Sequence, residues 1–183
     1  MKKLFALLAV ICLMVSFAAA EEEADPWIRY QWTDELAEEA AGKEFHKVNF
    51  KAGERGLSMY LPAYLQDAGI PEGQDGVIAC FADEAKGRTV TVSIRALPEG
   101  KAELAAKLQA MEEELRKDGW GSFSLALVNE VSGVKTERAE KKETAMMFPL
   151  SADSVLFLSI SPADDEEFRK DYEMVIASLE AVE

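Results

Sequence analysis

Residues 77–95 read VIACFADEAKGRTVTVSIR, and this stretch decides the fold class. An apolar run at 77–82 is followed by a turn, after which Val90, Val92 and Ile94 alternate with polar residues. Because successive side chains of a strand point to opposite faces, the alternation predicts a strand with one buried and one polar face. Together the two runs predict an antiparallel hairpin.

Residues 101–118 follow with helical rather than strand spacing. Their large apolar side chains recur at intervals of four, three and four residues, which places them on one face of an amphipathic helix. That face is narrow, so we expect the helix to lie flat on a sheet, with Gly119 as its C-terminal stop. The apolar side chains are Leu104, Leu108, Met111 and Leu115.

Two shorter helices are predicted nearer the ends of the chain. Thr33 is a candidate N-cap for a helix over 34–41, which has acidic residues in its first turn. A terminal helix is predicted to begin with Ser161 as its cap, Pro162 at the first helical position and Asp164 as the acid of a capping box.

The rest of the regular structure is predicted to be strand, which gives the order helix, four strands, helix, four strands, helix. We expect Ser132-Gly133 to form a turn between two of the strands. Strands do not alternate with helices, so the order predicts an α+β fold: an antiparallel β-sheet flanked by helices, an α/β/α sandwich, in a single domain over 33–183. The further strands are 45–50, 57–62, 122–127, 134–140, 143–149 and 155–160.

Three segments of this pattern resemble the PsbP-like superfamily. Residues 56–62, GLSMYLP, are similar to the early strand of that family, which ends in proline. Residues 129–134, NEVSGV, are similar to its strand and glycine turn after the middle helix, and 168–179 to its closing helix. The resemblance implies an exported bacterial member of the family, with an α+β fold and a habit of binding other proteins. It implies no reaction and no particular functional residue.

The N-terminus has the order of a secretory signal peptide. Two lysines precede an apolar stretch over 4–17, and three alanines then meet the acidic run that starts at Glu21. The apolar stretch is shorter than the ~20 residues of a membrane-spanning helix. We therefore expect residues 1–20 to be cleaved after Ala20, 21–32 to be an N-terminal leader, and the product to be secreted or extracytoplasmic without a stable membrane anchor.

A lipoprotein signal is the alternative for this segment, with Cys12 as the lipidated residue. Bulky Ile11 stands where such a signal needs a small residue, and this disfavours the alternative. Only Cys80 then remains after cleavage, so no intramolecular disulfide is expected despite the oxidising destination.

Charge limits the partners of the chain. The formal net charge is −14, and removal of Lys2 and Lys3 makes it −16. Such a surface repels phosphate backbones and anionic membranes, so no nucleic acid is expected as a partner. A cationic partner is compatible with this charge, although self-repulsion that keeps the surface soluble is the commoner reason for it.

The residues that could carry catalysis each have a simpler structural interpretation. His46 is the single histidine and is expected in a strand at the surface, and Cys80 lies in an apolar run where burial is expected. Ser132 and Lys135 match S-x-x-K, but in a predicted turn rather than at a helix start. The acidic run 164–167 suits a helix N-terminus better than a calcium loop, which needs ligands spread along a turning backbone.

These observations predict a non-catalytic interaction or accessory module of the cell envelope, without cofactor or metal. Two alternatives stay open, an envelope hydrolase that uses paired carboxylates and a divalent-cation-dependent accessory factor. For binding, the candidate residues are five aromatic side chains that could line a groove for a peptide or a sugar. The simpler interpretation, which we favour, is that they hold the N-terminal segment against the sheet. They are Trp27, Tyr30, Trp32, Tyr60 and Tyr64.

Overall fold

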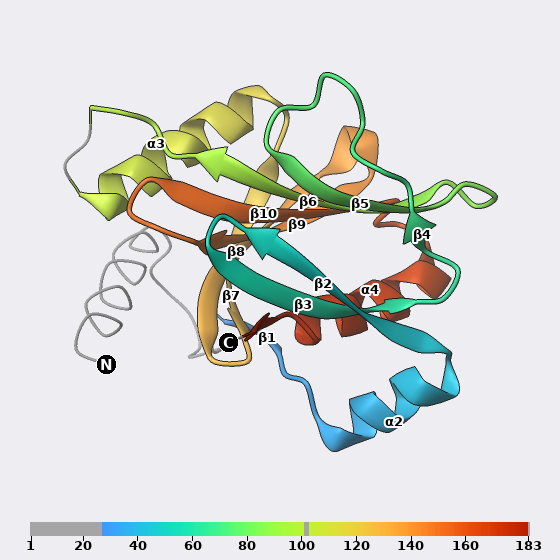
Figure 1. The fold of residues 1–183 in the computed structure, drawn as a ribbon. Helices are drawn as coiled ribbons and strands as arrows, with labels where there is room; N and C mark the ends of the chain where they lie inside the picture. The colour runs from blue at the N-terminus through green and yellow to red at the C-terminus, as the bar shows by residue number, and fades with distance from the viewer. Residues whose placement is uncertain (1–26, 101–102, 183) are drawn as a thin grey trace, which may run out of the picture.

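The computed structural model describes residues 27–100 and 103–182 (Figure 1). The predicted signal peptide, its cleavage site after Ala20, the alternative site at Cys12 and leader residues 21–26 lie outside these ranges. The boundary predicted at residue 33 stays a prediction, and residues 28–30 already form a strand paired within the main sheet.

The predicted α+β class is confirmed by two sheets, three α-helices and one short 3-10 helix (Ala139–Lys141) in the described ranges. The α-helices are α2 (Asp34–Gly42), α3 (Leu104–Lys117) and α4 (Glu166–Ala177). The strands of the large sheet are β1 (Ile28–Tyr30), β4 (Gln66–Asp67), β5 (Val77–Asp83), β6 (Arg88–Ala96), β7 (Gly121–Val128), β8 (Val131–Arg138), β9 (Glu143–Pro149) and β10 (Ser154–Ser161). The small sheet contains β2 (Phe45–Ala52), β3 (Arg55–Pro62) and β11 (Glu180–Val182).

The large sheet has eight strands in the order β1-β7-β8-β9-β10-β6-β5-β4, and the small sheet has the order β11-β3-β2. All pairs are antiparallel except β1 with β7, which is parallel. The sequence pattern did not indicate β1, β4 or β11, because three residues or fewer are too short to show a period of two. In the described chain, no helix has both the length and the apolar character needed to cross a membrane.

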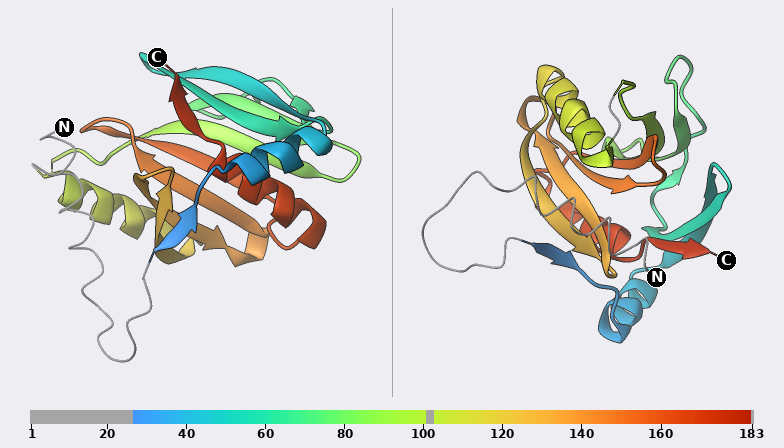
Figure 2. Two further views of the ribbon diagram at one scale, coloured as in Figure 1. Left: turned by 90° about the horizontal axis from the view of Figure 1, so that it is seen from below. Right: turned by 90° about the vertical axis from the view of Figure 1, so that its left-hand side faces the viewer.

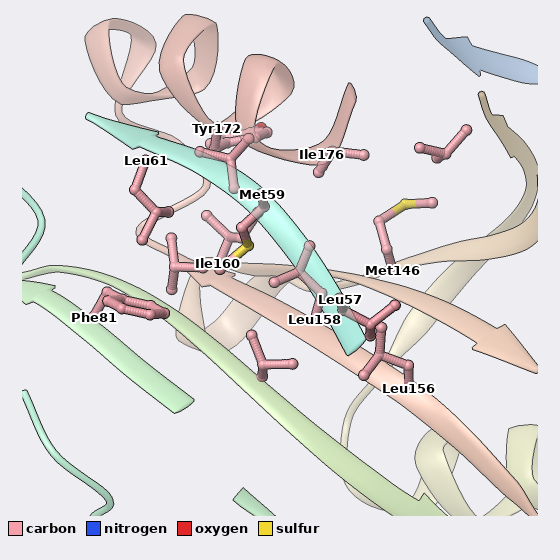
Figure 3. Packing of buried hydrophobic residues seen from close by; sticks show 14 of the residues in the cluster. Leu57, Met59, Leu61, Phe81, Met146, Leu156, Leu158, Ile160, Tyr172 and Ile176 are labelled. Atoms are coloured by element: carbon pink, nitrogen blue, oxygen red, sulfur yellow. The ribbon is translucent and has the colours of Figure 1, made fainter. Parts of the chain in front are cut away.

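Helix α3 covers one face of the large sheet, while α4 and the small sheet cover the other (Figures 1 and 2). The predicted flat packing of α3 is confirmed by Met111 and Leu115, which are buried beside Trp120 and Phe157. The opposite face forms the larger core, in which β3 meets β10 and α4 (Figure 3). Its labelled members include Leu57, Met59, Leu61, Leu158, Ile160, Tyr172 and Ile176.

The turn predicted at Ser132-Gly133 is wrong by three residues. The chain turns at Asn129 and Glu130, which both have positive φ (46° and 69°), a conformation that asparagine tolerates better than most residues. Gly133 instead lies inside β8, where a Cβ atom would come within 2.7 Å of the Met147 carbonyl oxygen. This glycine therefore serves a close approach between strands rather than a turn.

The predicted cap of the terminal helix is also wrong. Ser161 is the last residue of β10 and pairs with Thr89, so it cannot cap a helix. The N-cap of α4 is Asp165, whose carboxylate accepts hydrogen bonds from the backbone N–H groups of Glu167 and Phe168. The cap of α2 by Thr33 is confirmed, with the Leu36 N–H as its donor.

Candidate functional site

The largest groove described on the surface lies between β2 and β5, and we call it the β2–β5 groove. Its volume is about 850 Å³, within the range of small-ligand and peptide sites. From β2 it is lined by His46, Val48, Asn49, Phe50 and Lys51; from β4 and its flanks by Leu65, Gln66, Asp67, Gly69 and Ile70; and from β5 by Val77, Ile78, Ala79, Cys80 and Phe81.

The groove runs along strand edges rather than across a sheet face. A face presents only every second residue of a strand, whereas here consecutive residues of both strands contribute, 48–51 of β2 and 77–81 of β5. Within the described residues, β2 pairs only with β3, so its outer edge has no neighbouring strand along the groove. An unpaired edge presents a row of N–H and C=O groups for another strand.

The floor of the groove is apolar. Val48 and Phe50 of β2 and Ile78 of β5 are half-buried against the main core. Ile70, on the loop beyond β4, is 61% exposed at the rim.

The single histidine and the remaining cysteine both line this groove. The predicted surface position of His46 on a strand is confirmed. Cys80 is buried as predicted, and its sulfur lies 3.7 Å from the Thr91 hydroxyl. Ser132 and Lys135, the S-x-x-K pair, are three residues apart in β8 and therefore point to opposite faces of the sheet.

The five aromatic candidates do not line one common groove, although Trp32 contacts Tyr60 and lines a surface pocket together with Tyr30. Trp32 stacks on Tyr60, with ring centroids 5.2 Å apart, and the Trp32 backbone N–H donates to the Asn129 side-chain oxygen. Tyr30 is in β1, where burial and the nearby Glu173 carboxylate raise its pKa to about 12. Trp27 is half-buried at the start of the described chain.

Tyr64, the fifth aromatic residue, belongs to a cluster around Arg88 that sequence reasoning missed. The Arg88 side chain is 2% exposed, and its guanidinium lies between the rings of Tyr64 and Phe168 at 5.4 and 5.3 Å. It donates to Asp165 at 2.7 and 2.9 Å and to Glu167 at 2.9 Å. Burial opposes the charged form, but these hydrogen bonds raise the pKa of Arg88 above its ordinary value. We call these five residues the Arg88 cluster.

A signal for this cluster was present in the sequence. Arg88 is in phase with Val90 and Val92, on the buried face of the alternating strand, and a buried arginine needs partners. Tyr64 extends the network because its hydroxyl donates to Asp171 at 2.6 Å, and Lys43 donates to the same carboxylate at 3.3 Å. Burial, and then this hydrogen bond, raises the pKa of Tyr64.

The predicted helix start at the acidic run 164–167 is confirmed for Asp165, which is the N-cap, and for Glu166 and Glu167 in the first turn, whereas Asp164 precedes the helix. Asp164 pairs with Lys142 at 2.7 Å, and Glu167 pairs with Lys86 at 3.1 Å as well as with Arg88. The pKa of Asp165 is lowered by the Phe168 N–H and then by Arg88. Among the residues that the structure describes, no three His, Cys, Asp or Glu side chains are grouped as metal ligands would be.

No protein-family model and no curated protein matches the sequence. Among solved structures, the chain is similar to the Saccharomyces cerevisiae Ran-binding protein Mog1p, with 12% identity and a TM-score of 0.43 over 75% of this chain and 95% of that one. A mutant of protein Mog1 has 13% identity and a TM-score of 0.39, over 73% and 86%. LpqN, involved in cell envelope biogenesis of Mycobacterium tuberculosis, has 13% identity and a TM-score of 0.40, over 84% and 99%.

Proposed function

We propose that this protein is exported and acts without catalysis, as a module that binds another protein of the cell envelope or the extracellular space through the β2–β5 groove. The observation that carries the proposal is the course of the groove along the unpaired edge of β2, over an apolar floor. The sequence resemblance to the PsbP-like superfamily, which implies protein binding, supports the same function.

The apolar floor and the unpaired backbone edge of β2 contribute to binding in different ways. A partner that covers Val48, Phe50 and Ile78 removes apolar surface from water at a gain of roughly 25 cal/mol per Å². The edge of β2 adds backbone hydrogen bonds that fix the position and direction of the bound segment. The groove therefore offers both affinity and orientation to an extended polypeptide.

Export is supported by the sequence alone and has a direct test. We expect the protein purified from outside the cytoplasm of its producing organism to begin at Glu21, which intact-mass measurement and N-terminal sequencing check. A product that keeps Met1, or that carries a lipid on Cys12, would contradict the expected processing.

The binding site is tested by capture with two matched variants. Ile70 and Val131 are both exposed aliphatic residues, at 61% and 55%, but Ile70 borders the groove and Val131 begins β8 near the opposite edge of the sheet. We expect Ile70→Ser to reduce, at least several-fold, the partner recovered from the producing organism's extracytoplasmic fraction by the immobilised protein, because an apolar contact is lost. Val131→Ser should leave recovery unchanged.

Equal recovery by both variants and the unchanged protein would show that the groove is not the binding surface. Quantitative mass spectrometry of the captured proteins makes the comparison. The same wash conditions must be used for all three proteins.

A further inference from the structure

We infer, on the basis of the proposed function, that the occupant of the β2–β5 groove is an extended segment of the partner protein that pairs with β2 as a fourth strand of the small sheet. The segment carries apolar side chains at every second position and carboxylates at the positions between them. The direction of the backbone groups of β2, the apolar floor and the charges of β2 each define one property of this segment.

The direction of the backbone groups in β2 follows from its ladder with β3. The Tyr60 N–H donates to the Ser178 hydroxyl at 2.8 Å, so it points away from β2. Tyr60 is opposite Lys47, and residues of an antiparallel ladder alternate between bonded and non-bonded pairs. Pro62, which has no N–H, is opposite Phe45 in the same non-bonded set. The N–H and C=O groups of Lys47, Asn49 and Lys51 therefore point outward into the groove.

The apolar positions of the bound segment follow from the same alternation. Val48 and Phe50 point to the core face of β2, and Ile78 completes the floor on the side of β5. A strand laid against β2 presents every second side chain to that floor, and these side chains must be apolar to be buried there. The intervening side chains lie on the outer face with Lys47 and Lys51.

The charges of β2 indicate which residues the bound segment carries at the positions between its apolar side chains. Residues 43–55, the β2–β3 hairpin turn with its entry, carry Lys43, Lys47, Lys51 and Arg55 against Glu44 and Glu54, a net charge of 4 − 2 = +2 in an acidic chain. Lys47 also pairs with Glu180 of β11, whereas Lys51 has no ion-pair partner within the described ranges. Directly opposed residues of neighbouring strands share a face, so carboxylates of the bound strand lie beside these two lysines. Lysines at the same positions would repel them.

Repulsion between the lysines of two β2 strands disfavours a second copy of this chain as the occupant. In an antiparallel pairing of two β2 edges centred on Asn49, Lys47 of one copy lies opposite Lys51 of the other. Each copy would also bring a net charge of −14, or −16 without the two N-terminal lysines.

The first experiment titrates the protein with synthetic peptides matched in length to β2. One alternates valine with glutamate, one valine with lysine, and one is the glutamate peptide N-methylated at the glutamates. At an ionic strength of about 0.15 M, charges more than about 8 Å apart are largely screened. The relative affinities of the peptides then depend on the charge pairs between peptide side chains and the lysines directly opposite them in β2. We expect the glutamate peptide to bind about tenfold more tightly than the lysine peptide, and the N-methylated peptide to lose binding.

Backbone amide hydrogen exchange, followed by NMR, locates the bound peptide. In the free protein we expect fast exchange at Lys47, Asn49 and Lys51 and protection at Val48 and Phe50, whose amides face β3. The glutamate peptide should protect the first three. Tighter binding of the lysine peptide would overturn the charge assignment, and unchanged exchange at those three amides would overturn the strand pairing.

A matched pair of variants tests the backbone directly. Asn49→Pro removes one outward N–H at a position on an edge strand, where proline is tolerated, while Asn49→Ala keeps it. We expect the proline variant alone to lose the glutamate peptide. Equal binding by the two variants would overturn strand addition, and changes of the β2 signals with protein concentration alone would identify a second copy as the occupant.

These outcomes are separable from those of the proposed function. If the peptides fail to bind while Ile70→Ser still reduces capture of the natural partner, the strand model of the occupant is wrong and the groove remains the binding surface. If capture is insensitive to both Ile70→Ser and Asn49→Pro, the proposed site itself is wrong.

Discussion

Tyr64 and Leu65 are neighbours in the chain, yet the first belongs to the Arg88 cluster and the second lines the β2–β5 groove. In the Arg88 cluster, the charged groups have their partners within the chain, from Asp165 and Glu167 to the two flanking rings. In the groove, the outer edge of β2 has no neighbouring strand among the residues that the structure describes, and the apolar floor is only half-buried. The Arg88 cluster is therefore expected to support the fold, and the groove is the region that we propose for binding.

The largest effect is expected from Arg88→Met. Arg88 is buried but Asp165 and Glu167 are in contact with water, so the substitution mainly removes charge-assisted hydrogen bonds, and we expect a loss of about 2 kcal/mol in the free energy of unfolding. Urea denaturation measures it. Lys86→Ala is the matched control, because Lys86 pairs with the same Glu167 at the surface and should have no measurable effect. Equal losses of stability in both variants would show that the Arg88 cluster does not stabilise the fold more than a surface ion pair does.

A smaller loss is expected from Tyr64→Phe. The variant keeps the ring beside Arg88 but removes the hydroxyl that donates to Asp171, and a hydrogen bond to a charged group contributes about 1.5 kcal/mol. Tyr60→Phe is the control, since its stacking on Trp32 does not depend on the hydroxyl. Thermal and urea denaturation of both variants make the comparison, and an unaffected Tyr64→Phe protein would contradict the assigned role.

Acid should weaken the Arg88 cluster. The pKa of Asp165 is lowered first by the Phe168 N–H and then by Arg88, and that of Glu167 first by its hydrogen bond to Arg88. A folded-state pKa below the unfolded value gives stability that is present above the unfolded pKa and lost as the pH falls through the folded one. We therefore expect stability to fall below about pH 4, and to fall less steeply in Arg88→Met. Parallel pH profiles of the two proteins would rule out this linkage.

The smallest effect is expected from Ile70→Ser. Ile70 is exposed at the rim of the groove, so its replacement should change the free energy of unfolding by less than about 0.5 kcal/mol, within the range of ordinary surface substitutions. Denaturation of this variant beside the unchanged protein tests the expectation. A larger loss would mean that Ile70 supports the fold, and the contrast between the two regions would then fail.

Much of the fold was predictable from local pattern. The alternation at Val90, Val92 and Ile94 predicted β6, and the spacing from Leu104 to Leu115 predicted α3 and its flat packing. The incorrect predictions concern residues whose type is compatible with two different local structures. Gly133 was interpreted as a turn residue, but it permits the close approach to β9, and Ser161 was interpreted as a cap, but it ends β10.

The candidate site was much less predictable. All five aromatic residues were considered for one groove, but the structure distributes them between the Trp32–Tyr60 stack, β1 and the Arg88 cluster. Whether they bind anything stays a prediction. The groove that the structure does show contains few residues with a sequence signature, since its defining feature is the edge of β2.

The sequence by itself determined the class of the fold, because periods of two and of 3.6 residues fix which side chains share a face before any long-range contact forms. It also determined the charge of the surface. Three features depend on the three-dimensional structure: the division of the strands into two sheets, the contact of Arg88 with Asp165, 77 positions away, and the single neighbour of β2 among the described strands. Those outcomes depend on pairings between distant segments, which residue patterns within a single segment do not encode.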